Sequence, residues 1–304
     1  MNRRIFVSRI VWFVLLVAFG SVVRADPGVL VLGRISDDPQ RHHDQLKPLL
    51  DYVVPRMADV GIREGRILMA RDASRMTSYL RHGRVDWVTE TAATGLILMD
   101  RASASLLMLT ERDGVKHYRS IVFVRANSPV RALSDLSGRR LALQNPTSTS
   151  AYLLPAITLL DAGISMEILP APADSPSPES VGYVFANSES NIATWVLKGV
   201  VDAGAFSDVD FARLQERDPR AASLRVVGRS MPAPRAMELV RADLDARIRQ
   251  RLQQVLAQAA TDPLAAPALL RFFGTTAFVV PTDADRAALD ELSAATRRTR
   301  EAIE

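Results

Sequence analysis

Short apolar runs alternate with helical patterns along most of the chain. The runs that fit β-strands are Val29–Ile35, Ile67–Ala70, Val85–Thr89, Leu106–Leu109, Ser120–Arg125, Arg140–Leu143, Tyr183–Ala186, Val201–Phe206, Arg225–Gly228 and Met237–Arg241. Between these runs, apolar residues recur every three or four positions, as from Leu46 to Met57 and from Leu244 to Leu256, which predicts amphipathic helices. This alternation is typical of an α/β protein whose sheets carry helices on their faces.

Two prolines fall inside the helical patterns. Pro55 interrupts the first helix, and Pro155 interrupts the helix that follows residues 146–150. Because proline has no backbone N–H and its ring clashes with the preceding turn, we expect each helix to bend or shorten there.

The predicted elements divide into two lobes, each with a mixed sheet flanked by helices. We assign residues 26–117 and 235–304 to lobe one and residues 118–234 to lobe two, so the chain crosses between the lobes twice. Such proteins bind their ligand between the lobes, outside the carboxyl ends of the strands, and close by hinge motion.

The N-terminus has the pattern of a secretory signal peptide. Arg3, Arg4 and Arg9 precede an apolar run from Ile10 to Val23, and a small-residue cleavage site follows at Val23-Arg24-Ala25. The run is shorter than the roughly 20 residues of a membrane-spanning helix, so we expect residues 1–25 to be removed. The alternative is an uncleaved membrane anchor, and both Sec and twin-arginine export remain open.

Removing the signal peptide changes the charge of the protein. The full chain has a net charge of +4 and a pI near 9.7, but residues 1–25 contain four arginines and no acidic residue, so the mature chain is neutral. A neutral chain lacks the basic surface that nucleic acid requires, and we expect no nucleic-acid partner.

The residues that would support metal or covalent chemistry are scarce. The chain has no cysteine, which excludes disulfides, thiolate ligands, a cysteine nucleophile and a lipidated N-terminal cysteine. The four histidines lack metal-site spacing, and no nucleophile elbow or nucleotide loop is present. We therefore predict no metal, no cofactor and no enzymatic activity, with an exported enzyme as the least favoured alternative.

A run of hydroxyl residues follows the strand Arg140–Leu143. Ser148, Thr149 and Ser150 lie where a helix begins, and the free N–H groups of a helix N-terminus attract anions. Three hydroxyls can add donors without adding charge. The alternative is that they only cap the helix, because serine and threonine are favoured N-cap residues.

At these residues the sequence resembles the periplasmic phosphonate and phosphite solute-binding proteins of ABC transporters. The matching motifs, in order, are Tyr118–Arg125, Asp135-Leu-Ser-Gly138, Pro146-Thr-Ser-Thr-Ser150, Gly163-Ile164, Val196-Leu-Lys-Gly-Val-Val-Asp-Ala-Gly204 and Ser230-Met-Pro-Ala-Pro234. The resemblance implies the type II periplasmic-binding-protein fold and an oxyanion held by Ser148, Thr149 and Ser150.

Other family positions differ in this chain. The usual histidine ten residues before Gly199 is replaced by Glu189. The aromatic residue expected after the strand at Val85-Asp86 is missing, and Thr89-Glu90-Thr91 and Thr94 stand there instead. We predict that Glu90 or Glu189 meets the cationic end of a zwitterion, with Asp208 as a further cleft residue. The alternative is that the glutamates face solvent or pair with arginines.

The signal peptide and the absence of cysteine predict an unlipidated protein of the periplasm, which we expect to be a monomer. The resemblance implies that it binds a small anionic or zwitterionic ligand and delivers it to a membrane ABC permease. A membrane sensor kinase that recognises the same closed form is the alternative partner.

Overall fold

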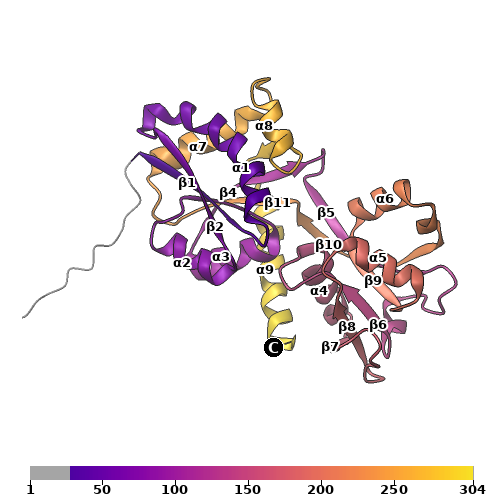
Figure 1. The fold of residues 1–304 in the computed structure, drawn as a ribbon. Helices are drawn as coiled ribbons and strands as arrows, with labels where there is room; N and C mark the ends of the chain where they lie inside the picture. The colour runs from indigo at the N-terminus through magenta and orange to yellow at the C-terminus, as the bar shows by residue number, and fades with distance from the viewer. Residues whose placement is uncertain (1–27, 304) are drawn as a thin grey trace, which may run out of the picture.

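Two six-stranded mixed sheets organise residues 28–303, the part of the chain that the computed structural model describes (Figure 1). The first sheet has the order β12-β4-β11-β3-β1-β2. Its strands are β1 Val29–Ile35, β2 Glu64–Ala70, β3 Trp87–Glu90, β4 Ser105–Arg112, β11 Ala236–Val240 and β12 Thr275–Val279. Strand β1 pairs in parallel with β2 and β3, whereas β11 runs antiparallel to both β3 and β4. The carboxyl ends of β1, β3 and β4 therefore lie at one edge of this sheet.

The second sheet has the order β10-β5-β9-β6-β8-β7. Its strands are β5 His117–Arg125, β6 Arg140–Leu143, β7 Ser165–Ile168, β8 Ser180–Phe185, β9 Ala203–Ser207 and β10 Leu224–Pro234. Strand β6 is parallel to β8 and β9, and the long strands β5 and β10 pair antiparallel.

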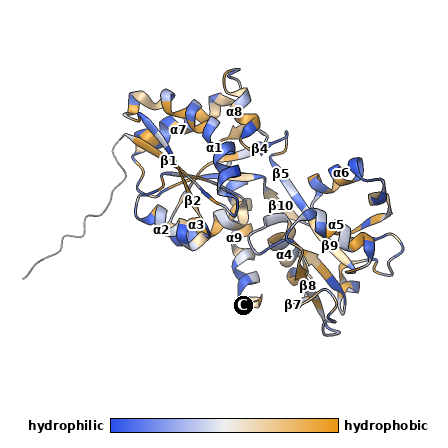
Figure 2. Cartoon of the chain, in the orientation of Figure 1, coloured by the Kyte–Doolittle hydropathy of each residue, from blue (hydrophilic) through white to orange (hydrophobic). Residues whose placement is uncertain are grey.

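Helices cover the sheets, and the hydrophobic residues concentrate along the strands and the inner helix faces (Figure 2). The helices are α1 Pro39–Val53, α2 Ala73–Arg81, α3 Ala92–Ala102, α4 Leu154–Asp161, α5 Glu189–Lys198, α6 Asp208–Arg217, α7 Ala246–Ala259, α8 Ala266–Arg271 and α9 Asp283–Ile303. The expected two-lobed α/β fold is confirmed.

Both prolines alter their helices as expected. The α-helical geometry of α1 stops at Val53, and a 3₁₀ helix with Pro55 in its first turn continues to Val60. Pro155 lies in the first turn of α4, which follows a π-helical turn at Thr149–Leu153. His42 and His43 belong to α1, which begins at Pro39 because the Asp38 side chain accepts from the Arg41 N–H.

Two short segments connect the sheets. The first joins β4 to β5 after Arg112, and the second joins β10 to β11 at Arg235, whose N–H donates to the Lys116 carbonyl at 2.9 Å. Antiparallel pairing of β5 with β10 continues up to these crossings. The two connections therefore run side by side, as in a two-stranded hinge.

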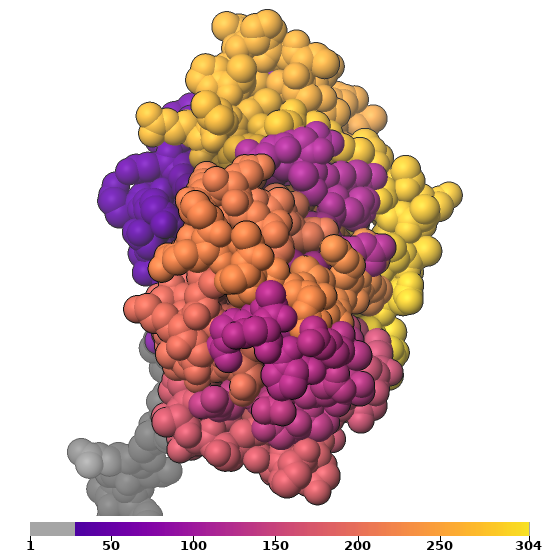
Figure 3. All heavy atoms as spheres, turned by 90° about the vertical axis from the view of Figure 1, so that its right-hand side faces the viewer, coloured from indigo at the N-terminus to yellow at the C-terminus, as the bar shows by residue number. Residues whose placement is uncertain are grey.

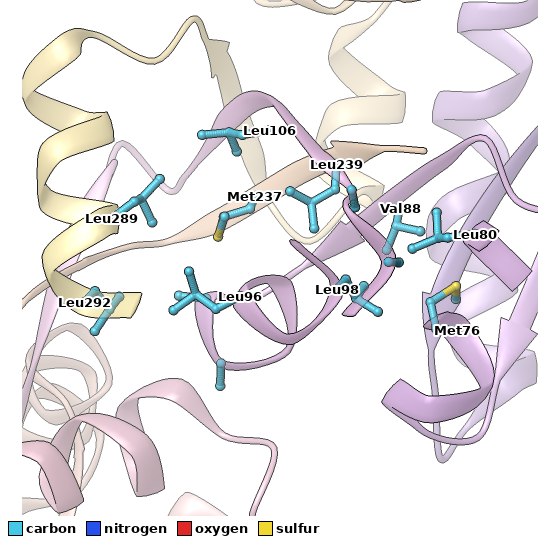
Figure 4. Close-up of a cluster of buried hydrophobic side chains, with 14 of the residues drawn as sticks. Met76, Leu80, Val88, Leu96, Leu98, Leu106, Met237, Leu239, Leu289 and Leu292 are labelled. Carbon is cyan, nitrogen blue, oxygen red and sulfur yellow. The ribbon is translucent and has the colours of Figure 1, made fainter. Parts of the chain in front are cut away.

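One cluster of buried apolar residues extends from the first sheet into the second lobe. Met76, Leu96 and Met237 belong to the same cluster as Leu292 of α9 (Figure 4), and residues of α4 also belong to it. Helix α9 contacts both α4 and β10, and the C-terminal residues run along one side of the molecule in the space-filling view (Figure 3). The lobes are thus packed against each other.

The predicted signal peptide lies outside the described residues. Within residues 28–303, every helix is too short or too polar to cross a membrane.

Candidate functional site

The hydroxyl turn at Ser148–Ser150 makes contacts inside the protein. The Ser148 Oγ accepts a hydrogen bond from the Ala151 N–H at 3.1 Å, which is the N-cap role. The Thr149 Oγ1 accepts from the Ala93 N–H at 2.8 Å, and Thr149 and Ala93 are both buried. Ala93 lies in the first turn of α3, whose own N-cap residue Thr91 makes no side-chain cap. Thr149 of lobe two therefore caps a helix of lobe one.

Tyr118 of β5 contacts this turn. Its hydroxyl interacts with the side chains of Thr149 and Ser150, and burial raises the pKa of Tyr118 above its usual value. The guanidinium carbon of Arg235 lies 5.2 Å from the centroid of the Tyr118 ring. The turn is thereby joined to a group of positive charges at the hinge.

Three arginines gather where the strands of the first sheet meet the hinge. Arg34 lies near the end of β1, Arg112 ends β4, and Arg235 occupies the second crossing. We call Arg34, Arg112 and Arg235 the arginine cluster. Arg112 is 7% exposed, and Arg34 and Arg235 are half-buried.

The charges of the arginine cluster are not neutralised by ion pairs. No carboxylate oxygen within residues 28–303 lies within 4.0 Å of these guanidiniums. The Nε and Nη2 atoms of Arg112, and the Nε atoms of Arg34 and Arg235, are buried without a hydrogen-bond partner. Burial, followed by the positive charges of Arg34 and Arg235, lowers the pKa of Arg112 to about 9. Buried donors without partners are costly, so the cluster is suited to receive an anion.

Phe273 and His42 complete the surroundings of Arg34 and Arg112. The guanidinium carbons of Arg34 and Arg112 lie 4.4 and 4.7 Å from the centroid of the Phe273 ring. The His42 ring lies 5.9 Å from that ring, and its Nδ1 is 2.6 Å from the Ser36 Oγ. Burial and the nearby charges of Arg34 and Arg41 lower the pKa of His42 to about 4, so this imidazole is neutral at physiological pH.

Glu90 is held by hydrogen bonds within lobe one. Its Oε1 accepts from the Ile35 N–H at 2.7 Å, and its Oε2 accepts from the Thr94 hydroxyl at 2.8 Å. Glu90 is 4% exposed, so its carboxylate fixes the start of α3 against the end of β1.

A second buried carboxyl, Glu238, was not predicted from the sequence. It accepts from Trp87 Nε1 at 2.6 Å and from the hydroxyls of Thr89 and Thr110 at 2.8 and 2.6 Å. Burial raises its pKa, and the charge of Arg112 opposes that rise.

Glu189 lines a cavity of about 370 Å³ in lobe two, together with Ser190, Asp210 and Arg213. Burial, followed by the negative charge of Asp210, raises the pKa of Glu189 to about 7, while Arg235 and Arg213 act in the opposite direction. Arg213 pairs with Asp113 of the hinge turn at 2.7 Å. Arg213 also pairs with Asp210 at 3.2 Å, and Arg217 lines the same cavity. The cavity therefore holds two acidic and two basic side chains and is linked to the hinge through Arg213.

Asp208 lies in a different hollow. It lines a cavity of about 400 Å³ with Ile121, Phe211 and Arg229, and its Oδ1 accepts from the N–H groups of Arg119 and Val209 at 3.1 and 3.0 Å. Asp208 thus anchors the start of α6 to β5.

The raised pKa of Glu189 predicts that the stability of the protein depends on pH. A folded-state pKa above that of the unfolded chain means that the native state binds more protons between about pH 4.5 and 7. Stability should therefore fall as pH rises through this window. At pH 8, Glu189→Gln should unfold at a higher urea concentration than the wild type, with a free energy of unfolding larger by on the order of 1 kcal/mol. At pH 4 the two proteins should have equal stability. Equal unfolding curves at pH 8 would contradict the assignment, and Glu216→Gln, on an exposed part of α6, serves as the control.

The structure brings Thr149, Ser150, Tyr118 and the arginine cluster together, and Asp208 lies at the start of α6, where it accepts from the N–H of Arg119, the residue after Tyr118. The arginine cluster was missed because arginine is common on surfaces. The position of two of its arginines could have revealed it. Arg34 is the penultimate residue of β1 and Arg112 is the last residue of β4, and ligands bind at the carboxyl ends of such strands. Among the described residues, no cluster of His, Asp or Glu is arranged to hold a metal ion.

Solved structures support this architecture. XAC2383 from Xanthomonas citri, in structures bound to chloride ion and to ATP, is 50% identical with a TM-score of 0.86, over 90–91% of this chain and 99–100% of those chains. PhnD1 from Prochlorococcus marinus, in complex with methylphosphonate, has a TM-score of 0.65 at 16% identity, over 90% of this chain and all of that chain, and it supports the fold.

A curated relative is similar over a shorter stretch. The phosphate-import protein PhnD of Mycolicibacterium smegmatis is 24% identical over 126 residues, which span 40% of this chain and 38% of that protein. Residues 35–286 match the family model described as "ABC transporter, phosphonate, periplasmic substrate-binding protein". The chain is therefore a member of the periplasmic substrate-binding protein family of phosphonate ABC transporters.

Proposed function

We propose that this protein captures a small phosphorus oxyanion between its lobes and delivers it to a membrane ABC permease. The observation that carries the proposal is the buried Arg112 side chain, whose Nε and Nη2 have no partner. Arginine binds phosphate and phosphonate oxygens through paired N–H donors. A bound oxyanion would satisfy these donors and neutralise the arginine cluster.

The hydroxyl groups beside the cluster supply further donors. Tyr118, Thr149 and Ser150 interact with one another next to Arg235, and hydroxyls can rotate to donate to an anion. Thr149 and Ser150 interact with Tyr118. The Thr149 Oγ1 also accepts from the Ala93 N–H, which leaves its hydrogen free to donate, while the Ser148 Oγ caps its own turn. We therefore place the ligand between the arginine cluster and residues 149–150.

A ligand with a cationic end fits the same site. Glu189 lies close enough to Arg235 for their charges to affect each other, whereas Asp210 in the same cavity is already paired with Arg213. An ammonium group there would favour the ionised form of Glu189. Glu90 is unsuited to this role because both its oxygens accept hydrogen bonds inside lobe one.

The remaining features of the proposal concern the mature protein. We propose that residues 1–25 are removed on export, that the protein stays unlipidated and monomeric in the periplasm, and that it binds its ligand without altering it. Electrophoretic mass and intact-mass spectrometry of the exported protein test cleavage and lipidation directly.

Calorimetric titration of the exported protein tests ligand capture. Phosphate, methylphosphonate and an aminoalkylphosphonate should bind, with sulfate, chloride and ATP as comparisons. Thr149→Val combined with Ser150→Ala should weaken binding about tenfold or more, because two hydroxyls are lost. Thr147→Val changes an exposed hydroxyl of the same turn and should bind like the wild type. Absence of binding by every phosphorus oxyanion would overturn the proposal.

A further inference from the structure

Phe273 has an unusual backbone for an aromatic residue. Its φ of 56° lies in the left-handed region, which a bulky residue other than glycine enters at a cost. It follows α8 and precedes β12, in the turn that brings its ring to Arg34 and Arg112. A strained residue held at a charged site needs a reason beyond turn formation, since glycine would form the turn more easily.

The ring contacts two like charges at once. Both guanidinium carbons lie less than 5 Å from its centroid, so they lie less than 10 Å from each other and repel. The face of an aromatic ring carries partial negative charge and attracts cations, especially when they are removed from water. Phe273 thus offsets the repulsion without supplying a carboxylate that would compete with an anionic ligand.

The turn that carries Phe273 is fixed to the hinge. The Asp113 N–H donates to the Gly274 carbonyl at 2.9 Å, and a Cβ on Gly274, which has a φ of 66°, would lie 2.9 Å from the Asp113 Oδ1. Asp113 directly follows Arg112. The ring and the guanidinium that it contacts are therefore held by neighbouring backbone segments.

We propose that Phe273 is a positioning residue for ligand binding: its ring orders Arg34 and Arg112 so that their free N–H groups receive the same oxyanion. The inference rests on the proposed function, because it assumes that the arginine cluster binds an anion. Phe273 itself contributes no polar contact to the ligand.

Phe273→Leu tests the inference, because leucine keeps apolar volume and the same backbone strain but has no aromatic face. Calorimetric affinity for inorganic phosphate and methylphosphonate should fall about tenfold. Phe273→Tyr and Phe273→Trp restore the aromatic face and should bind within about threefold of the wild type. Phe278→Leu makes the same change in a buried ring that contacts Phe272 and should lower the melting temperature while leaving affinity unchanged.

The outcomes separate the two proposals. If wild-type protein binds phosphate or methylphosphonate and Phe273→Leu binds them equally well, the positioning role is wrong and the proposed function stands. Loss of affinity in all three Phe273 variants together would also contradict the inference, because a structural role alone explains it. If the wild type binds no phosphorus oxyanion, both proposals fail.

Discussion

Arg112→Met is expected to reduce oxyanion affinity by about 100-fold or more while raising the stability of the ligand-free protein. The affinity falls because the most buried guanidinium of the cluster is removed. The stability rises because Arg112 is a buried charge without an ion pair, next to two further positive charges. Even a buried ion pair can often be replaced by apolar residues of similar volume with no loss, or with a gain of about 1–4 kcal/mol, and Arg112 has no ion pair within residues 28–303 to lose.

Calorimetry and thermal unfolding measure the two effects, and Arg225→Met is the matched control. Arg225 is half-buried and its Nε likewise lacks a hydrogen-bond partner, but its Nη2 donates to the carbonyls of Ser128 and Val130 at 3.3 and 2.8 Å. Its replacement should lower stability and leave oxyanion affinity unchanged. A lower melting temperature for Arg112→Met would show that its charge is satisfied in solution and would contradict the anion-site assignment.

The second large effect is expected in the core that joins the lobes. Leu292 of α9 is fully buried in the cluster that also contains Leu154 and Ile157 of α4. Leu292→Ala removes this side chain from a packed site and should lower the free energy of unfolding by about 2–5 kcal/mol. Urea unfolding followed by circular dichroism measures the change.

Glu291→Ala provides the comparison for Leu292→Ala. Glu291 is the preceding residue of the same helix and is exposed, so its replacement should change stability by less than about 0.5 kcal/mol. An equally small effect of Leu292→Ala would indicate that α9 does not pack against the body of the protein in solution.

The fold was largely predictable because hydrophobic periodicity is a local signal. Buried strands such as Val29–Ile35 and Arg140–Leu143 have the bounds expected from their apolar runs. Strands β7 and β12 were missed, since both are short, lie at sheet edges and contain exposed residues. Strand β10 extends to Pro234, beyond the prediction, because proline is tolerated in an edge strand.

The candidate site was only partly predictable. The hydroxyl turn was identified, and the capping interpretation holds for two of its residues: Ser148 caps its own turn and Thr149 caps α3. Ligand contact by Thr149 and Ser150, which lie beside Tyr118, stays a prediction. Glu90 has an internal role that no spacing rule reveals, because its partner, the Ile35 N–H, is 55 residues away.

By itself, the sequence determined the α/β class, the resemblance to the family and the position of the hydroxyl turn, since these depend on local pattern and motif order. Only the tertiary structure decided which charges lack partners. Arg34, Arg112 and Arg235 are far apart along the chain and resemble ordinary surface arginines until folding buries Arg112, half-buries the other two and leaves all three without an ion pair to a carboxylate of residues 28–303. Whether a charge is neutralised depends on distances across the fold, and those distances are set by packing.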